Sequence, residues 1–258
     1  MTTRTEDLAR IEEALTAASE AVLPYTPGAV AYETKAERGD PLTEADLAVD
    51  RVLRSILPSP GEGWLSEETA DDPARLDRRR CWVVDPIDGT REFVQGIPEW
   101  CISIGLVEDG VPVAGGILNP ATGERVVGSL ETGVTVNGNS VPPLEDRTLA
   151  GARVYASRSE VGRGEWARFD EAPFEVVPCG SVAYKLALVA AGLCDATWTL
   201  VPKHEWDVAA GAALVRAAGL TVIHADGREP RFNRPVPRLT DFLAGPARLL
   251  QEFRAHWA

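Results

Sequence analysis

The sequence has no long apolar run, few cysteines and few histidines, and these shortages narrow the classes of protein that it can encode. No segment holds 18 or more consecutive apolar residues, so we expect no membrane-spanning helix. The first residues also lack the apolar stretch of a secretory signal. Together these absences favour a soluble protein that works in the cytoplasm.

Side chains that commonly bind zinc or form disulfides are scattered. The four cysteines occur singly, with no C-x-x-C pair, and the chain has only three histidines. A zinc site or a disulfide framework would need such residues to be clustered. We therefore expect four reduced, mostly buried cysteines and no chemistry that depends on a histidine cluster.

Basic residues are also scarce, because 26 Lys and Arg stand against 39 Asp and Glu, which gives a formal net charge of −13. Nucleic-acid polymers and anionic membranes require a basic face, so neither is an expected partner. An acidic protein that binds phosphate must reverse its local electric field. Bound divalent cations are the simplest way to do so.

The first half of the chain reads as helices followed by an antiparallel sheet. Apolar residues at three- and four-residue steps predict helices over residues 5–22 and 43–57. A short apolar run at 82–84 predicts a buried strand that leads into a turn. Hairpin turn signals then separate four further strands, at 101–107, 111–118, 125–128 and 134–136.

The second half alternates strands with helices. We expect a boundary near residue 145, which divides an α+β part at 1–145 from an α/β part at 146–258, with two sheets packed between layers of helices. The predicted strands are 152–156, 195–199, 221–223 and 241–243. The predicted helices are 182–191, 207–218 and 246–257.

Residues 85–90, Asp-Pro-Ile-Asp-Gly-Thr, form the most informative segment. The preceding strand delivers Asp85 to its carboxyl end, where α/β proteins build sites. Two carboxylates on a tight turn can face one point, and Gly89 allows the backbone to approach a ligand closely. Asp, Pro and Gly are also ordinary turn residues, so this segment alone does not decide between a site and a surface turn.

Three other acidic segments can each be explained by an ordinary structural role when taken alone. Residues 40–46 open a helix, where Asp46 fits a capping role. Glu67-Glu68 follows a glycine-rich turn and reads as a solvated charged loop. Asp207 opens another helix, where a single acid is often a cap.

The four acidic segments together resemble the lithium-sensitive, magnesium-dependent phosphatases typified by inositol monophosphatase. Order and approximate spacing agree, and residues 93–98, 102–104 and the Gly180-Ser181 helix entry are similar as well. The resemblance extends from about Lys35 to Gly219. It implies a layered αβαβα sandwich of the inositol monophosphatase and fructose-1,6-bisphosphatase type, and a metal-dependent phosphoric monoester hydrolase.

The resemblance also implies a set of metal ligands. Glu67, Asp85 and the backbone carbonyl of Ile87 would hold one Mg²⁺, and Asp85, Asp88 and Asp207 would hold a second, with Asp85 bridging. A third, weaker ion would rest on Glu67 and water, so that two or three ions serve the site. Oxygen ligands without histidine suit Mg²⁺.

Catalytic and substrate-binding roles follow by the same resemblance. Asp46 and Thr90 would orient and deprotonate the attacking water, and Glu67 would support them through the metal. The expected phosphate and substrate contacts are Asp88, Gly89, Thr90, Gly180, Ser181 and Lys203. Relatives are often dimers and are inhibited by lithium, so both properties are expected here.

Two other functional classes stay open from the sequence. Haloacid-dehalogenase phosphatases use a D-x-D-G-T motif with an aspartyl nucleophile, whereas here the two aspartates are three residues apart. A catalytically silent binding or regulatory protein on the same fold is the alternative outside enzymes. Phosphate release with Mg²⁺ separates it from an enzyme.

The substrate is expected to be a small phosphorylated metabolite. Inositol phosphatases of this family place a glutamate before the Trp-Asp pair, near a position that is Leu200 here. Lys203 suggests a second phosphate, and residues 90–93 resemble 3′(2′),5′-bisphosphate nucleotidases, although Lys203 also fits a solvated charge. Residues 93–98 instead resemble the inositol branch, and histidinol-phosphate phosphatases share the scaffold. The preferred hypothesis is 3′-phosphoadenosine 5′-phosphate.

Overall fold

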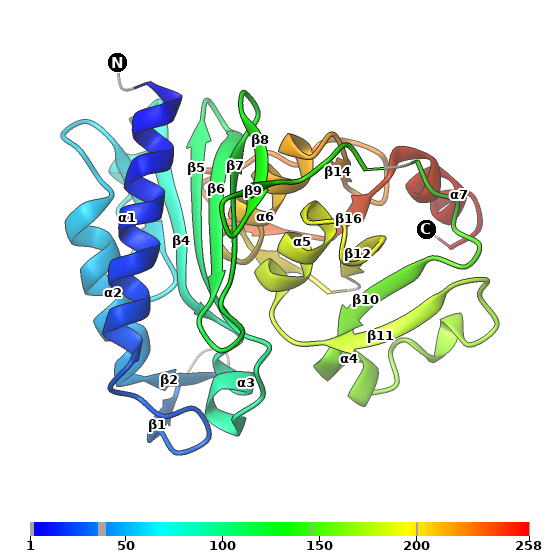
Figure 1. Ribbon diagram of the computed structural model, residues 1–258, viewed down its shortest axis with the longest axis horizontal. Coiled ribbons are helices and arrows are strands. Elements are labelled where there is room, and N and C mark those ends of the chain that lie inside the picture. The colour runs from blue at the N-terminus through cyan, green and yellow to red at the C-terminus, as the bar shows by residue number, and fades with distance from the viewer. Residues whose placement is uncertain (1–2, 36–39, 145, 200, 258) are drawn as a thin grey trace.

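The computed structural model describes residues 3–35, 40–144, 146–199 and 201–257, and it places two β-sheets between layers of helices (Figure 1). In the larger sheet β3 runs parallel to β4 and every later strand is antiparallel to its neighbour. In spatial order its strands are β3 (Gly63–Ser66), β4 (Arg80–Asp88), β5 (Cys101–Glu108), β6 (Val111–Asn119), β7 (Glu124–Ser129), β8 (Gly133–Val136) and β9 (Asn139–Ser140). The expected meander of hairpins is confirmed.

Helices α1 (Arg4–Val22) and α2 (Glu44–Ile56) cover the outer face of the larger sheet (Figure 1). Each begins at a threonine whose side chain accepts a backbone N–H while an acid three residues on bonds back to the threonine N–H. For α2 this reciprocal cap is made by Thr43 and Asp46. The predicted start of α2 is therefore confirmed, and the cap fixes Asp46 at the beginning of the helix.

The smaller sheet contains five strands and lies beyond a second pair of helices. Strand β10 pairs in parallel with β11 and β12, whereas β16 is antiparallel to β12 and β14. The spatial order is β11 (Glu175–Cys179), β10 (Arg153–Ser157), β12 (Ala196–Thr199), β16 (Phe242–Gly245) and β14 (Thr221–Ile223). Helices α5 (Val182–Ala190) and α6 (Glu205–Ala217) fill the space between the sheets.

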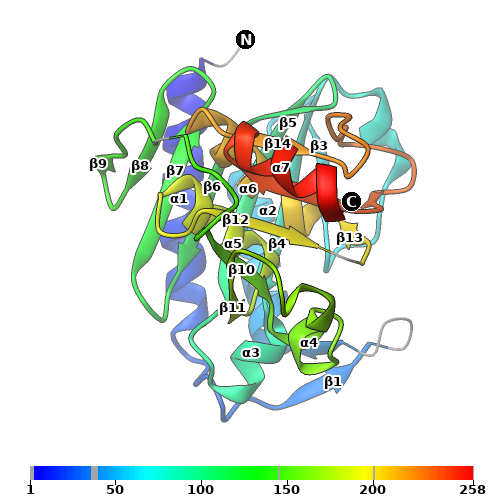
Figure 2. The ribbon, with the colours of Figure 1, turned by 90° about the vertical axis from the view of Figure 1, so that its right-hand side faces the viewer.

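The outer layer beyond the smaller sheet is formed by α4 (Arg158–Gly162) and α7 (Ala247–Trp257), as the two perpendicular views agree (Figures 1 and 2). The result is the expected five-layer sandwich of helix, sheet, helix, sheet and helix. One glycine shows how tightly the layers pack. A Cβ atom on Gly115 would lie 2.5 Å from the carbonyl oxygen of Ala210, so only glycine lets α6 approach β6 this closely.

Several short elements were missing from the sequence prediction because they have too few residues to show a period. They are β1 (Tyr32–Thr34), β2 (Pro41–Thr43), β13 (Lys203–His204), β15 (Arg238–Leu239), α4, β3, β9 and β11, and the 3₁₀ helices η1 (Pro73–Asp77) and η2 (Ala167–Phe169). Helix α3 (Thr90–Gln95) begins where the family resemblance implies a short helix, directly after Gly89. Strand β4 is also longer than the predicted 82–84, and α6 begins at Glu205 rather than at Asp207.

The expected boundary residue, 145, lies outside the described residues, and the division of the chain there stays a prediction. One core cluster combines side chains from both sides of it, such as Ile117 of β6 with Leu186 of α5 and Leu214 of α6. All four cysteines are buried and unpaired, as expected. Within the described ranges, no helix has the length and apolar character needed to cross a membrane.

Candidate active site

The carboxyl end of β4 delivers two aspartates to one place because its pairing with β5 is irregular. Asp85 lies opposite Ser103, whereas Asp88 lies opposite Cys101, so three steps along β4 match two steps along β5. Residues three apart in a regular strand would point to opposite faces. The extra residue of this bulge turns Asp88 to the face that Asp85 occupies. The backbone then turns through Gly89, whose φ is 94°, and enters α3 at Thr90.

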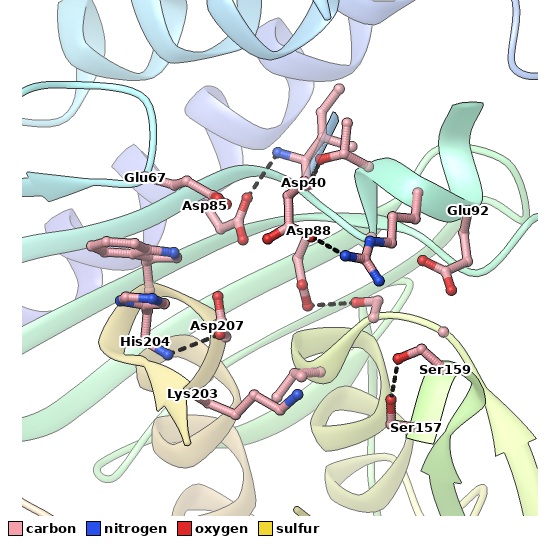
Figure 3. A pocket seen from close by; sticks show the side chains of 18 of the residues that line it. Asp40, Glu67, Asp85, Asp88, Glu92, Ser157, Ser159, Lys203, His204 and Asp207 are labelled. Carbon is pink, nitrogen blue, oxygen red and sulfur yellow. Dashed lines mark hydrogen bonds and ion pairs between the residues drawn. The ribbon is translucent and has the colours of Figure 1, made fainter. Parts of the chain in front are cut away.

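Three carboxylates from separate elements meet beside this strand end. Glu67 follows β3, Asp85 belongs to β4, and Asp207 lies in the first turn of α6. Each contributes an oxygen atom, and these atoms all lie within 4.8 Å of one another (Figure 3). We call these three residues the acidic cluster. Asp207 is oriented by its Oδ2 atom, which accepts a hydrogen bond from the backbone N–H of His204 at 3.0 Å.

The electrostatics of the acidic cluster are unfavourable without a bound cation. Burial raises the pKa of Asp85 well above its ordinary value, and the neighbouring charges of Glu67, Asp88 and Asp207 raise it further. Burial likewise raises the pKa of Asp207 well above the ordinary range, with Asp88 and Glu67 as the next causes. Buried carboxylates at this spacing must be protonated or share a cation. Their oxygen donors therefore fit a hard divalent ion.

Asp88 is held by the start of α5. Its Oδ2 atom accepts hydrogen bonds from the Ser181 hydroxyl at 2.6 Å and from the Ala183 backbone N–H at 2.5 Å. Ser181 is the N-cap of α5 and has a positive φ of 53°, a conformation that is rare for a residue with a side chain. Because both bonds go to Oδ2, Asp88 retains its Oδ1 atom for another partner.

Asp46 and Thr90, which the sequence paired as catalytic candidates, are in contact. Thr90 Oγ1 lies 3.2 Å from Asp46 Oδ1 and 2.9 Å from the carbonyl oxygen of Ile87. Asp46 Oδ2 is bound by the N–H and hydroxyl of Thr43, at 2.8 and 2.6 Å. Burial raises the pKa of Asp46 despite these bonds. The helix cap at α2 thus also places a carboxylate oxygen beside Thr90.

One lysine bonds to the edge of the acidic cluster. Lys35 Nζ lies 2.8 Å from Glu67 Oε1 and 2.6 Å from Glu68 Oε1. Burial opposes the charge of this lysine, but the two glutamates outweigh it and raise the pKa of Lys35. Burial and the adjacent Glu67 raise the pKa of Glu68 to about 7. Lys35 therefore compensates part of the local negative charge.

A pocket of about 670 Å³ opens above these groups and brings the predicted substrate residues together. Its size falls within the range of sites for small organic ligands. The predicted contacts that line it are Asp88, Gly89, Thr90, Gly180, Ser181 and Lys203. Lys203 Nζ lies 3.3 Å from Oε1 of the fully buried Glu160, so this lysine is partly neutralised rather than solvated.

Other lining residues were not identified from the sequence. They are Glu92 of α3, Ser157 and Ser159 at the β10–α4 junction, Arg163 after α4, and Arg238 of β15. Arg238 reaches the pocket because β15 pairs with β13, where it lies opposite His204. The sequence has no signal for this two-residue pairing. Leu200, where an inositol-type glutamate was expected, lies outside the described residues.

Comparisons with known proteins agree with this fold and site. The model of the inositol monophosphatase family matches residues 4–257. The inositol-1-monophosphatase ImpA of Mycolicibacterium smegmatis is 35% identical over 232 residues, which cover 85% of this chain and 82% of that protein. The 3′-phosphoadenosine 5′-phosphate phosphatase of Mycobacterium leprae is 34% identical over 212 residues, 76% of each chain.

Solved structures of inositol monophosphatase family members have the same fold as this chain. The Thermotoga maritima IMPase superposes with a TM-score of 0.83 at 25% identity, covering 98% of this chain and 96% of that one. CysQ from Bacteroides thetaiotaomicron, described as a bacterial member of the inositol monophosphatase family, gives 0.78 at 29% identity, covering 93% and 97%.

The layered sandwich and the buried acidic pocket define a metal-dependent phosphatase. The chain belongs to the inositol monophosphatase family, whose model it matches over nearly its full length. This family assignment replaces two earlier hypotheses, a haloacid-dehalogenase phosphatase and a catalytically silent protein.

Proposed function

We propose that this protein is a Mg²⁺-dependent phosphomonoesterase whose substrate is 3′-phosphoadenosine 5′-phosphate. One observation carries the proposal: a single pocket combines an acidic floor with basic side chains on its wall. Glu67, Asp85 and Asp207 form the floor, and Lys203 and Arg238 line the same pocket. A substrate with two phosphates could bind one at a metal on the floor and the other at the basic wall.

The residues that would hold the metal are those expected from the sequence. Glu67, Asp85 and the Ile87 carbonyl would take one ion, and Asp85, Asp88 and Asp207 a second, with Glu67 available to a third. The Oδ1 atom of Asp88 is available to bind a metal ion, since the bonds of Asp88 to Ser181 and Ala183 use Oδ2. When bound, the metal neutralises charge on the phosphoryl group and makes water a better nucleophile.

The remaining catalytic work belongs to the protein itself. Asp46 Oδ1 and Thr90 Oγ1, 3.2 Å apart, would hold the attacking water and accept its proton. The backbone N–H groups of Gly89 and Thr90 would donate hydrogen bonds to phosphate oxygens, because the turn at Gly89 leaves them outside the strand pairing. Gly180 and Ser181 would flank the leaving group while Ser181 keeps Asp88 in place.

Lys203 is the main candidate for recognition of the second phosphate. Its pairing with buried Glu160 fixes the ammonium group at the pocket wall, which reduces the entropy lost when an anion binds. Arg238 is exposed and lines the same pocket. The relative from M. leprae, named for 3′-phosphoadenosine 5′-phosphate, supports this choice.

A second candidate substrate is inositol 1-phosphate, which the relatives named inositol-1-monophosphatase favour. The two are separated by initial rates of phosphate release with saturating Mg²⁺. We expect a far higher kcat/KM for 3′-phosphoadenosine 5′-phosphate than for inositol 1-phosphate or histidinol phosphate. The opposite ranking would overturn the substrate assignment.

The basic wall can be tested separately with Arg238→Ala. Because Arg238 is exposed, its removal should not impair folding, and we expect kcat/KM for the bisphosphate to fall about tenfold while that for inositol 1-phosphate changes little. Equal losses on both substrates would contradict a phosphate contact. Inhibition by lithium, a homodimeric assembly and a cytoplasmic location stay predictions, to be checked by inhibition kinetics, light scattering and cell fractionation.

A further inference from the structure

Glu92 projects into the pocket from the first turn of α3 although no motif assigns it a role. Its side chain lies against the backbone of Gly180, where a Cβ atom would come within 2.5 Å of Glu92 Cγ and 2.6 Å of Glu92 Cδ. Both Glu92 and Gly180 line the pocket. The absence of a side chain at position 180 therefore leaves the space that the Glu92 carboxylate occupies.

No other described residue pairs with the Glu92 carboxylate, in contrast to other acids at this end of the molecule. Among the described residues, no donor of another residue forms a hydrogen bond or ion pair with it, and its own N–H is the one backbone group that favours its charge. Glu99 binds Arg158 and the Gly180 N–H, at 2.5 and 2.6 Å. Glu160 binds Trp166 Nε1 at 3.0 Å and also Lys203.

A partly buried carboxylate without a hydrogen-bond donor destabilises the folded protein unless a ligand donates a hydrogen bond to it. Burial raises the pKa of Glu92, its own N–H and Lys185 oppose that rise, and the charges of Asp88 and Glu99 add to it. Partly buried carboxylates in folded proteins are normally hydrogen-bonded. A carboxylate that faces a ligand pocket without a protein donor indicates that the ligand supplies the donor.

The surroundings of Glu92 indicate what that donor is. Ser157 and Ser159 line the same pocket, and their hydroxyl oxygens are 3.1 Å apart. In Figure 3 these serines lie on the same side of the pocket as Glu92, whereas His204 and Lys203 lie on the other. This side presents hydroxyl and carboxylate oxygens, which match the hydroxyl groups of a polyol or sugar better than they match a second phosphate.

We propose that Glu92 is a specificity-determining residue that accepts a hydrogen bond from a hydroxyl adjacent to the phosphorylated carbon of the leaving alcohol. The inference rests on the proposed phosphatase function and adds the substrate class, a phosphomonoester with a vicinal hydroxyl. Asp88 lies between Glu92 and the acidic cluster in Figure 3, so the recognised hydroxyl would be close to the scissile bond.

The test pairs each substrate with an analogue that lacks the hydroxyl. The pairs are 3′-phosphoadenosine 5′-phosphate with 2′-deoxyadenosine 3′,5′-bisphosphate, and inositol 1-phosphate with cyclohexyl phosphate. For the wild type we expect kcat/KM to be about 10- to 100-fold higher for the hydroxylated member, because a hydrogen bond to a charged group is lost with the analogue. In Glu92→Ala the preference should fall to about twofold or less, mainly through loss of the hydroxylated substrate.

Two further variants guard against a purely structural effect. Glu92→Gln keeps the shape and one acceptor, so it should retain an intermediate preference and allow the test even if Glu92→Ala folds poorly. Asp40→Asn removes a carboxylate that lines the same pocket but is paired with Arg91 at 2.7 Å, and it should keep the wild-type preference. A structural role for Glu92 would lower kcat/KM equally for both members of a pair.

The outcomes separate this inference from the proposed function. Hydrolysis by the wild type with no preference, or a preference that survives Glu92→Ala, would overturn the role of Glu92 and leave the phosphatase assignment intact. If the wild type releases phosphate from none of the four compounds in Mg²⁺, the proposed function fails and the role of Glu92 fails with it.

Discussion

Strand β4 joins two buried groups of acids that have opposite electrostatic surroundings. Its first residue, Arg80, belongs to an arginine network that consists of Arg4, Arg10, Arg80, Asp7, Glu62 and Glu108. Its other end carries Asp85 and the acidic cluster. Asp7 is fully buried and bonded to three arginines, whereas Lys35 is the one described basic side chain that forms an ion pair with the acidic cluster, at Glu67.

The pKa shifts follow this difference. Burial would raise the pKa of Glu62, but hydrogen bonds from Trp82, Ser59 and Arg10 outweigh it and lower the pKa. The pKa of Asp85 is raised by burial and by like charges together. The comparison teaches that burial alone does not decide the state of a carboxylate. The arginine network carries its own cations and serves stability, whereas the acidic cluster requires a cation from outside and serves function.

Asp85→Asn tests the functional role of the acidic cluster, and we expect it to have the largest effect on activity. The amide keeps the shape of Asp85 but removes the shared negative ligand, so we expect kcat/KM to fall on the order of 10³-fold. In EDTA the variant should be at least as stable as the wild type, because one repelling charge is gone. Mg²⁺ at 100 times its Kd should stabilise the wild type by about 2.7 kcal/mol and should not stabilise the variant.

These quantities are measured by phosphate release and by urea unfolding with and without Mg²⁺. A variant that stays as responsive to Mg²⁺ as the wild type would show that Asp85 does not bind the metal. A variant that unfolds more easily in EDTA would show that the acidic cluster stabilises the fold by itself.

Asp7→Asn tests the structural role of the arginine network. It leaves three arginines around a neutral amide, and breaking a buried ion pair in this way costs about 3–5 kcal/mol. Below the unfolding temperature, kcat should match that of the wild type, because the network lies at the opposite end of β4 from Asp85. Glu12→Gln is the matched control, since its pair with Arg125 is partly exposed and is expected to contribute less than about 1 kcal/mol. An Asp7 variant that keeps wild-type stability but loses activity would reverse the comparison.

The two regions were not equally predictable from the sequence. The segments that carry Asp85, Glu67 and Asp207 were identified because each follows or opens a regular element, and the family resemblance gave them a common purpose. The structure brings the three together, as expected. Sequence reading also placed the cap of α2 at Thr43 and Asp46, because a capping box is a local pattern of four residues, whereas the Thr3 cap of α1 was not identified.

Features that depend on distant pairing were missed. Arg80 reaches Asp7 across 73 residues, and nothing local in either segment indicates the contact. Arg238 lies at the pocket because two residues of β15 pair with β13. The bulge that turns Asp88 toward Asp85 arises from the register of β4 on β5, which the short prediction of 82–84 could not contain. Glu92 was quoted within a motif but received no role, because its exposure to the pocket is a tertiary property.

Glu205 offers a smaller test of whether backbone hydrogen bonds and nearby arginines that form no direct ion pair are enough to keep a buried acid ionised. It is fully buried in the first turn of α6 and accepts backbone N–H bonds from Asn233 at 2.6 Å and Arg234 at 3.1 Å. Burial nevertheless raises its pKa from 4.5 to about 7. Its contribution to stability is therefore fully present below pH 4.5 and is lost as the pH rises towards 7.

The difference between 4.5 and about 7 corresponds to about 3 kcal/mol, so metal-free wild type should lose that much more stability between pH 4.5 and 7.5 than Glu205→Gln does. Glu62→Gln should show the opposite sign, because a lowered pKa gives stability that is lost as the pH falls below 4.5. Urea unfolding in EDTA measures the effect of Glu205 between pH 4.5 and 7.5 and that of Glu62 below pH 4.5. If Glu205→Gln follows the wild-type pH profile, then backbone N–H groups and the nearby charges of Arg75 and Arg234 keep Glu205 ionised, and a buried acid needs no direct ion pair to stay charged.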